Sequence, residues 1–191
     1  MTTLAFRTAT IADIPALIDL VTSAYRGDAS RIGWTTEADL LDGQRIDAEM
    51  LRADLEQPRS LILVAEDGGR MVACAHVAED VADDMADDDV PTAYFGMFSV
   101  DPAIQGGGIG KAVLAEAERV ARDTLGCARM RMTVIDCRDE LIAFYVRRGY
   151  VRTGIRKPFP YGDARYGLPK RPDLRFEILE KPLSSLMETA R

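Results

Sequence analysis

The spacing of apolar residues divides the chain into alternating strands and helices. Residues 4–8 alternate between apolar and polar positions, and residues 60–66 form a nearly continuous apolar run, as strands do. Apolar residues at intervals of three or four predict helices over residues 13–25 and 109–125. A helical pattern also begins at Thr36, weakens at Gly43 and resumes from Ile46 to Leu55. The remaining predicted elements are strands over 71–77, 92–100, 130–135, 150–155 and 174–179, and a short helix over 138–148.

This order of elements predicts one domain built on a mixed sheet. The elements follow the order β-α-α-β-β-β-α-β-α-β-β over about residues 4–183, and we expect the whole chain, 1–191, to form a single domain. The strand, helix and strand over residues 92–135 predict a right-handed crossover between neighbouring parallel strands. We therefore expect an α/β fold with helices on both faces of the sheet.

A glycine-rich turn, residues 105–111 (Gln-Gly-Gly-Gly-Ile-Gly-Lys), lies between a predicted strand and the helix that follows it. The first N–H groups of a helix have no partner within the helix, and together with the helix dipole they attract anions. Glycines let a ligand approach the backbone because they have no Cβ. We interpret the turn as a cradle for a pyrophosphate group.

Two common phosphate-binding patterns do not fit this turn. A P-loop needs Ser or Thr after its Lys, but Ala112 follows Lys111, and Gln105 stands where the first Gly is needed. The dinucleotide pattern G-x-G-x-x-G would have Lys111 in place of its third Gly. A third pattern, [R/Q]-x-x-G-x-[G/A], fits residues 105–110. It resembles the acyl-CoA-binding turn of the GNAT superfamily of N-acyltransferases.

A second segment carries the same resemblance. Residues 143–150, Ala-Phe-Tyr-Val-Arg-Arg-Gly-Tyr, are similar to the GNAT signature A-x-x-Y-x-[KR]-x-G-[FY] with one spacing adjustment. One position departs from the family, because Arg138 stands where an Asn often lies seven residues before the Tyr, here Tyr145. The resemblance implies a mostly antiparallel sheet of about seven strands, with one parallel pair splayed apart at the CoA site.

The resemblance also implies a reaction and its residues. The reaction is transfer of an acetyl group from acetyl-CoA to a primary amine of a small molecule or peptide, by direct attack in a ternary complex and without a metal. Tyr145 corresponds to the tyrosine that protonates the leaving thiolate, which suits a phenol because its pKa lies near that of a thiol. The alternative is that Tyr145 is only an aromatic core residue. The residues expected to contact acetyl-CoA are Phe98, Ser99, Val100, Gln105, Gly106, Gly107, Gly108, Ile109, Gly110, Lys111 and Arg138.

The sequence leaves several candidates for the general base. Glu79, at the end of a predicted strand, is the first candidate, and Asp80, His76 and Tyr94 are alternatives. Residues 79–89 carry seven acidic side chains and no basic one. This segment is typical of a solvated loop, and the alternative is an electrostatic funnel for a cationic acceptor.

The family places the acceptor between the first helix pair and the loop that joins the last two strands. The candidate residues there are Trp34, Glu37, Tyr161 and Tyr166. Glu37 suits an ammonium group, whereas nearby Arg or Lys side chains suit a carboxylate. A zwitterionic metabolite therefore fits at least as well as a polyamine, while the acidic segment favours a polyamine or a basic peptide.

Composition narrows the class of partner. The 191 residues carry a net charge of −7, which argues against nucleic-acid binding because phosphate contacts need clustered cations. Three cysteines without paired or metal-like spacing, and a single histidine, argue against a metal site and suit a reducing compartment. We recognise neither a signal peptide nor an apolar run long enough to span a membrane. We therefore expect a cytoplasmic monomer or homodimer that binds neither nucleic acid nor membrane.

Two other functions stay open at this point. One is a non-catalytic module of the same fold that binds or senses acyl-CoA, which would keep the glycine turn without needing Tyr145. The other is a nucleotide-binding domain of another class, which would bind ATP or NAD more tightly than CoA.

Overall fold

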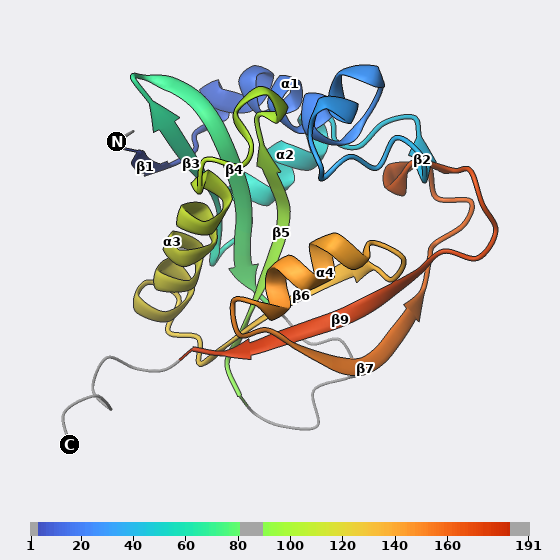
Figure 1. Cartoon of the computed structure of the whole chain (residues 1–191). Coiled ribbons are helices and arrows are strands. Elements are labelled where there is room, and N and C mark those ends of the chain that lie inside the picture. The colour runs from blue at the N-terminus through green and yellow to red at the C-terminus, as the bar shows by residue number, and fades with distance from the viewer. Residues whose placement is uncertain (1–3, 81–89, 184–191) are drawn as a thin grey trace.

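A central sheet of seven strands organises the computed structural model, which describes residues 4–80 and 90–183 (Figure 1). In their order across the sheet, the strands are β1 (Ala5–Thr8), β3 (Ser60–Asp67), β4 (Arg70–Glu79), β5 (Thr92–Val100), β6 (Arg129–Ile135), β9 (Arg175–Pro182) and β7 (Val151–Pro158). Neighbours are antiparallel except for β5 and β6, which are parallel. This confirms the predicted α/β fold. Most of the acidic segment lies outside the described residues, and so does the proposed funnel.

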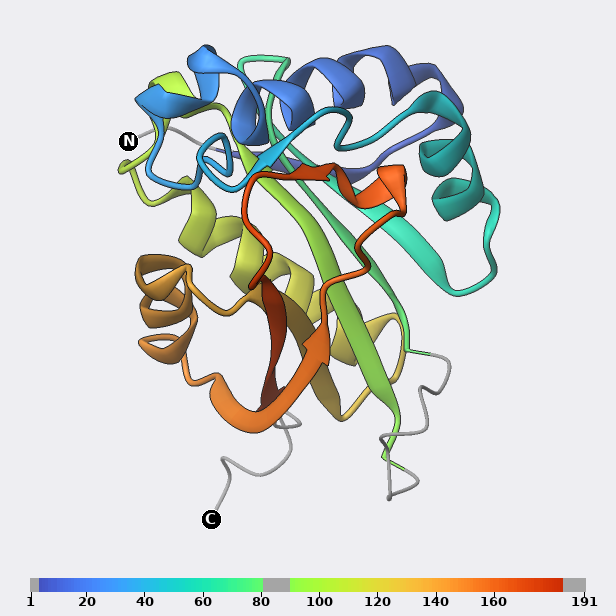
Figure 2. The ribbon, with the colours of Figure 1, turned by 90° about the vertical axis from the view of Figure 1, so that its right-hand side faces the viewer.

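Helices cover both faces of the sheet (Figures 1 and 2). The helices α1 (Ile14–Tyr25) and α2 (Ala48–Glu56) pack on one face, and α3 (Ile109–Asp123) and α4 (Asp139–Val146) pack on the other. Strand β3 is buried on both faces. Ile62 and Val64 pack in the core under α1, whereas Leu63 and Ala65 pack in the core under α3. Successive side chains of a strand point to opposite faces. A strand covered on both faces must therefore be apolar at every position, which explains the continuous run at 61–65.

The segment between α1 and α2 differs from the prediction. The expected helix from Thr36 to Leu55 is confirmed only in its second half, as α2. Before it the chain turns and forms strand β2 (Leu41–Asp42), which pairs with β8 (Leu168–Pro169) in a small second sheet. Gly43 adopts a φ of +75°, and the Asp47 side chain caps α2 by accepting from the N–H of Met50 (2.8 Å). Short 3-10 helices complete the described elements: η1 (Ile11–Asp13), η2 (Asp28–Ile32), η3 (Pro102–Ile104) and η4 (Ala164–Tyr166).

Strands β5 and β6 pair over only three residues. Residues 92–94 of β5 pair with residues 129–131 of β6, and beyond them the two strands diverge. Strand β6 stays paired with β9 as far as Ile135. The edge of β5 that faced β6 therefore has no strand partner from Phe95 onward. This confirms the splayed parallel pair.

Strand β5 also bends where it leaves β6. Its register with β4 shifts between Cys74 and His76, and Met97 has a φ of +48°, a left-handed conformation that is uncommon outside glycine. Tyr25, at the end of α1, donates a hydrogen bond from its hydroxyl to the carbonyl of Phe98. Helix α1 thereby holds the splayed part of β5 in place.

The bond from Tyr25 predicts a less stable protein when Tyr25 is replaced by Phe. Tyr25→Phe keeps the buried ring but removes the donor to the Phe98 carbonyl, which should lower the free energy of unfolding by about 1–3 kcal/mol. Urea denaturation measures the difference. Tyr166→Phe is the matched control, since Tyr166 is 46% exposed, and should stay within about 0.5 kcal/mol of the wild type. Equal stability of Tyr25→Phe and wild type would show that this bond does not hold the bend.

Candidate active site

The glycine turn leads from β5 into α3, as predicted. Gly106 and Gly108 adopt φ angles of +94° and +85°, which favour glycine, and a Cβ at either position would meet no atom within 4 Å. Gly108 is the N-cap of α3 and has no side chain to bond the first N–H groups of the helix. These N–H groups are therefore available to an anion that approaches through open space.

A cavity of about 220 Å³, which we call the glycine-turn cavity, lies beside this turn. Its lining residues are Trp34, Thr35, Phe98, Val100, Gln105, Gly106, Gly108, Gly110, Lys111, Phe144 and Arg148. Most of the residues predicted to contact acetyl-CoA are among them, whereas Ser99, Gly107, Ile109 and Arg138 are not. Lys111 and Arg148 add positive charge near the start of α3.

Gln105 joins the glycine turn to the loop that precedes β2. Its Oε1 accepts from the N–H of Trp34 (3.0 Å), and its Nε2 donates to Thr35 Oγ1 (3.0 Å) and to the carbonyl of Val100 (3.1 Å). Gly33 makes room for these bonds, because a Cβ there would lie 2.7 Å from Gln105 Oε1. The amide of Gln105 is therefore engaged within the protein, and it fixes residues 33–35 against the turn.

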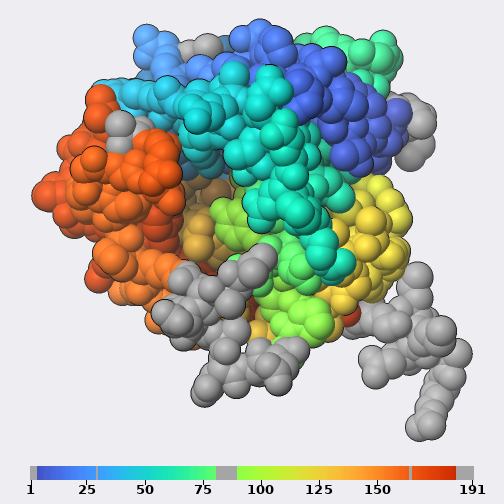
Figure 3. All heavy atoms as spheres, turned by 180° about the vertical axis from the view of Figure 1, so that it is seen from behind, coloured from blue at the N-terminus to red at the C-terminus, as the bar shows by residue number. Residues whose placement is uncertain are grey.

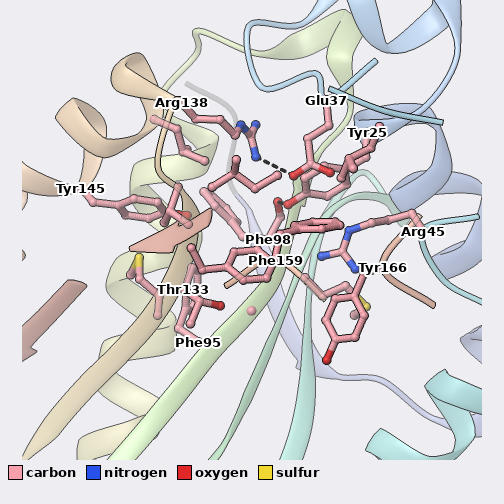
Figure 4. A pocket seen from close by; sticks show the side chains of 18 of the residues that line it. Tyr25, Glu37, Arg45, Phe95, Phe98, Thr133, Arg138, Tyr145, Phe159 and Tyr166 are labelled. Atoms are coloured by element: carbon pink, nitrogen blue, oxygen red, sulfur yellow. Dashed lines mark hydrogen bonds and ion pairs between the residues drawn. The ribbon is translucent and has the colours of Figure 1, made fainter. Parts of the chain in front are cut away.

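A second cavity, of about 160 Å³, lies between the diverging ends of β5 and β6, and we call it the splay cavity (Figure 4). Phe98 lines both cavities, so the two adjoin at this residue. Seen from behind, the surface of the molecule is hollowed between the segment coloured orange and the segment coloured green (Figure 3). Helix α4, β9 and residues 159–166 complete the walls of the splay cavity.

Tyr145 of α4 lines the splay cavity and also packs in the core. Its ring centroid lies 5.3 Å from that of Phe144 and 5.8 Å from that of Tyr150, in edge-to-face contacts. The side chain is 4% exposed, and burial raises the pKa of its phenol well above the ordinary value. The phenol therefore carries its proton at neutral pH, as a proton donor must.

Glu37 lies buried among cations at the edge of the splay cavity. Its carboxylate accepts hydrogen bonds from Arg26 Nη1 (2.7 Å) and Arg138 Nη1 (2.8 Å). Burial alone would raise the pKa of Glu37, but the charges of Arg138, Arg45 and Arg26 outweigh it and the pKa is lowered. Arg138 also donates to the carbonyl of Thr35. Arg138 thus lines the splay cavity and not the glycine-turn cavity, and its contact with acetyl-CoA stays a prediction.

The other predicted acceptor residues fall in three different places. Tyr166 lines the splay cavity. Trp34 lines the glycine-turn cavity, where its ring centroid lies 5.5 Å from that of Phe144. Tyr161 lines neither cavity. Its hydroxyl donates to the carbonyl of Arg171 (3.0 Å) and accepts from the N–H of Leu174 (2.7 Å).

Glu79, the first candidate for the base, lies outside both cavities. It forms an ion pair with Arg59 at the end of β4 and stands opposite Ala93 in the ladder with β5. Ala93 belongs to the stretch where β5 and β6 are still paired. Glu79 therefore lies at the closed end of the splay, away from the opening.

Among the alternative bases only Tyr94 lines the splay cavity. Burial raises the pKa of Tyr94, which keeps its phenol neutral. Asp80 pairs with Arg131 (3.1 Å), and His76 Nε2 lies 2.8 Å from Ser60 Oγ, both outside the cavity. Burial lowers the pKa of His76.

The sequence interpretation missed several residues that line these cavities. The sequence does not indicate that Arg26 and Arg45 belong to the site, because neither is part of a motif. In addition, Arg45 lies in the segment that was wrongly predicted to be helical. Phe159 could have been predicted, because it is an aromatic residue of the predicted acceptor loop and lies two residues before Tyr161. Arg148 belongs to the second GNAT motif, but no ligand contact was assigned to it.

The described residues contain no group of three or more His, Cys, Asp or Glu side chains placed to hold a metal ion. Within the same residues, no helix has both the length and the hydropathy that crossing a bilayer requires.

Residues 17–150 match the acetyltransferase (GNAT) family. The chain belongs to this family. GNAT proteins of known structure share its fold over almost their whole length. The ribosomal-protein-alanine N-acetyltransferase from Brucella melitensis is 22% identical with a TM-score of 0.68, covering 94% of this chain and 99% of that one. The ribosomal-protein-S18-alanine N-acetyltransferase from Escherichia coli is 17% identical with a TM-score of 0.64, covering 99% of both chains.

A GNAT acetyltransferase from Elizabethkingia anophelis, solved with acetyl-CoA bound, is 17% identical with a TM-score of 0.63, covering 94% of this chain and 98% of that one. At these identities the likeness establishes the fold. No protein of curated function matches the chain by sequence.

The cluster around Glu37 predicts a large loss of stability in Glu37→Gln. Among the described residues, Glu37 is the only carboxylate that pairs with Arg26 and Arg138. Removing one partner of a buried ion pair costs about 3–5 kcal/mol. Urea denaturation at neutral pH measures the loss. Because the pKa of Glu37 is lowered in the folded protein, the advantage of the wild type is complete above the ordinary value of 4.5 and shrinks as the pH falls below it.

Asp39→Asn is the control for Glu37→Gln. It breaks the ion pair between Arg31 and Asp39 (2.7 Å), in which both side chains are exposed, and should change the unfolding midpoint very little. A Glu37→Gln variant as stable as Asp39→Asn would contradict the structural role of the cluster.

Proposed function

We propose that the protein is an N-acetyltransferase that moves an acetyl group from acetyl-CoA to a primary amine, by direct attack in a ternary complex. The observation that carries the proposal is the pair of cavities that adjoin at Phe98. One lies beside a turn suited to a pyrophosphate, and the other contains a protonated tyrosine. A thioester held across the junction would lie within reach of both.

The glycine-turn cavity supplies the groups that acetyl-CoA needs. The pyrophosphate would be bound by the N–H groups at the start of α3, with Lys111 and Arg148 adding positive charge. Trp34 and Phe144 give the cavity an aromatic wall. The pantetheine arm carries amide groups, and the unpaired edge of β5 from Phe95 onward offers backbone partners for them.

The chemical step would take place at the junction of the cavities. The amine nitrogen attacks the thioester carbonyl carbon, and a main-chain N–H within residues 98–100 stabilises the oxyanion. When the C–S bond breaks, the sulfur takes a proton from the hydroxyl of Tyr145. The proton lost by the amine nitrogen then restores the phenol. The products are an amide and free CoA, and no metal takes part.

The mechanism predicts that Tyr145→Phe loses turnover and keeps acetyl-CoA binding. The variant retains the buried ring but has no proton for the leaving thiolate, so kcat should fall by about 100-fold or more. Release of free CoA with a panel of amines measures kcat, and calorimetry with acetyl-CoA measures binding. Tyr150→Phe is the matched control, because Tyr150 packs on Tyr145 but lines neither cavity.

The same experiment separates the competing functions. Unchanged kcat in Tyr145→Phe would refute the role of this tyrosine as the acid. Binding of acetyl-CoA without CoA release from any amine would favour a non-catalytic acyl-CoA module. Tighter binding of ATP or NAD than of CoA would refute the acyl-CoA site.

A further inference from the structure

The splay cavity has more positive than negative charge. Its charged lining residues are Arg26, Glu37, Arg45 and Arg138, so three guanidinium groups face a single carboxylate, an excess of two positive charges. A low-dielectric cavity with uncompensated charge of one sign attracts a ligand group of the opposite sign and disfavours a like charge.

Arg45 is the arginine of this group that bonds no carboxylate among the described residues, although its charge contributes to the lowered pKa of Glu37. Glu37 is shared by Arg26 and Arg138, whereas no ion pair joins Arg45 to a carboxylate of the described residues. Its guanidinium lies over the ring of Tyr25, 4.9 Å from the centroid. In Figure 4 the Arg45 side chain enters from the right and points into the space between Tyr25 and Tyr166. A planar guanidinium in this position suits a carboxylate, which it can bind through two parallel hydrogen bonds.

Arg26 adds to the uncompensated charge. Its Nη1 bonds Glu37, but its Nε and Nη2 are buried without a hydrogen-bond partner among the described residues. The residue is 7% exposed. These N–H groups have no acceptor that would offset the charge of Arg26, so Glu37 offsets that charge only in part, and an anion in the cavity would be attracted to it through space.

Several of the other residues that line the splay cavity are aromatic. Phe159 is central, with ring centroids 5.4 Å from Phe176 and 6.5 Å from Tyr166. Phe95 and Phe98 line the side of the cavity formed by β5. A group that lies beside the bound anion therefore meets apolar and aromatic surface.

We propose that the acceptor is a free α-amino acid with an aromatic or large apolar side chain, whose carboxylate is bound by Arg45. This inference rests on the proposed function, since it names the amine that the acetyl group reaches. The carboxylate would offset one of the two excess positive charges of the cavity, and the side chain would lie against the rings around Phe159. A polyamine or a basic peptide would bring further positive charge into a cavity that already has an excess, and is disfavoured for that reason.

The test compares amino acids with the amines formed by removing their carboxylate. Phenylalanine is paired with phenethylamine, tryptophan with tryptamine and leucine with 3-methylbutylamine. In the wild type we expect kcat/KM to be at least about 10-fold higher for the best amino acid than for its amine, the size of one charge-assisted hydrogen bond. Equal or faster turnover of the amines would overturn the proposal, with no variant needed.

Arg45→Met is expected to remove this preference by lowering kcat/KM for the amino acid while leaving that for the amine nearly unchanged. Arg45→Lys, which keeps the charge but not the paired donors, should give an intermediate value. Arg52→Met is the matched control, since Arg52 is an exposed arginine of α2 that lines neither cavity. A preference that survives in Arg45→Met would overturn the assignment of Arg45.

Binding of 3-phenylpropanoate separates this inference from the proposed function. This probe has the carboxylate and the ring but no amine to acetylate, and calorimetry should give binding to the wild type that weakens at least about 10-fold in Arg45→Met. If no amine releases CoA but the probe binds through Arg45, acyl transfer fails and the carboxylate site stands. If amines are acetylated but the probe binds wild type and Arg45→Met equally, acyl transfer stands and the carboxylate site fails.

Discussion

The separation of β5 from β6 after three residue pairs is the constraint on which the rest of the site depends. Parallel neighbours in a covered sheet normally satisfy each other's backbone groups along their whole length. Here that pairing stops at Tyr94 and Arg131, and the space opened in the middle of the sheet becomes the splay cavity. The positive φ of Met97 and the bond from Tyr25 to Phe98 hold β5 away from β6. The backbone conformation of β5 therefore maintains the opening.

A group of charged residues holds together the segments that close over this opening. Arg26 follows α1, Glu37 lies before β2, and Arg138 precedes α4. The ion pair between Glu37 and Arg138 joins positions that are 101 residues apart. Such a buried cluster is expensive to desolvate, and it is stable only while each carboxylate–guanidinium bond is made. The arrangement suits a site better than a core, because apolar side chains would fill the same space at lower cost.

The sequence predicted those parts of the fold and site whose causes are local. The strand at 60–66 and the glycine turn were predicted because apolar runs and glycine spacing act within a few residues. The segment before α2 was not, since the burial of Glu37 and Leu41 against distant residues outweighs helical spacing there. The convergence of Arg26, Arg45 and Arg138 could not be predicted, because isolated arginines have no periodicity and meet only through tertiary packing. Glu79 was favoured because it ends a strand, but the splay opens at the other end of that strand.

The loop at residues 33–37 has two attachments, one to Gln105 and one to Arg138. Gln105 holds Trp34 and Thr35 against the glycine turn, whereas Arg138 bonds Glu37 at the other end of the loop and also the carbonyl of Thr35. The loop is thus a common wall, and any ligand that stiffens it at one end changes the conformational freedom left at the other. Coupling of this kind is reciprocal, so the first substrate to bind and the second would alter each other's affinity by the same factor. The loop therefore couples the affinities of the two substrates in addition to any coupling through their direct contact at the junction of the cavities.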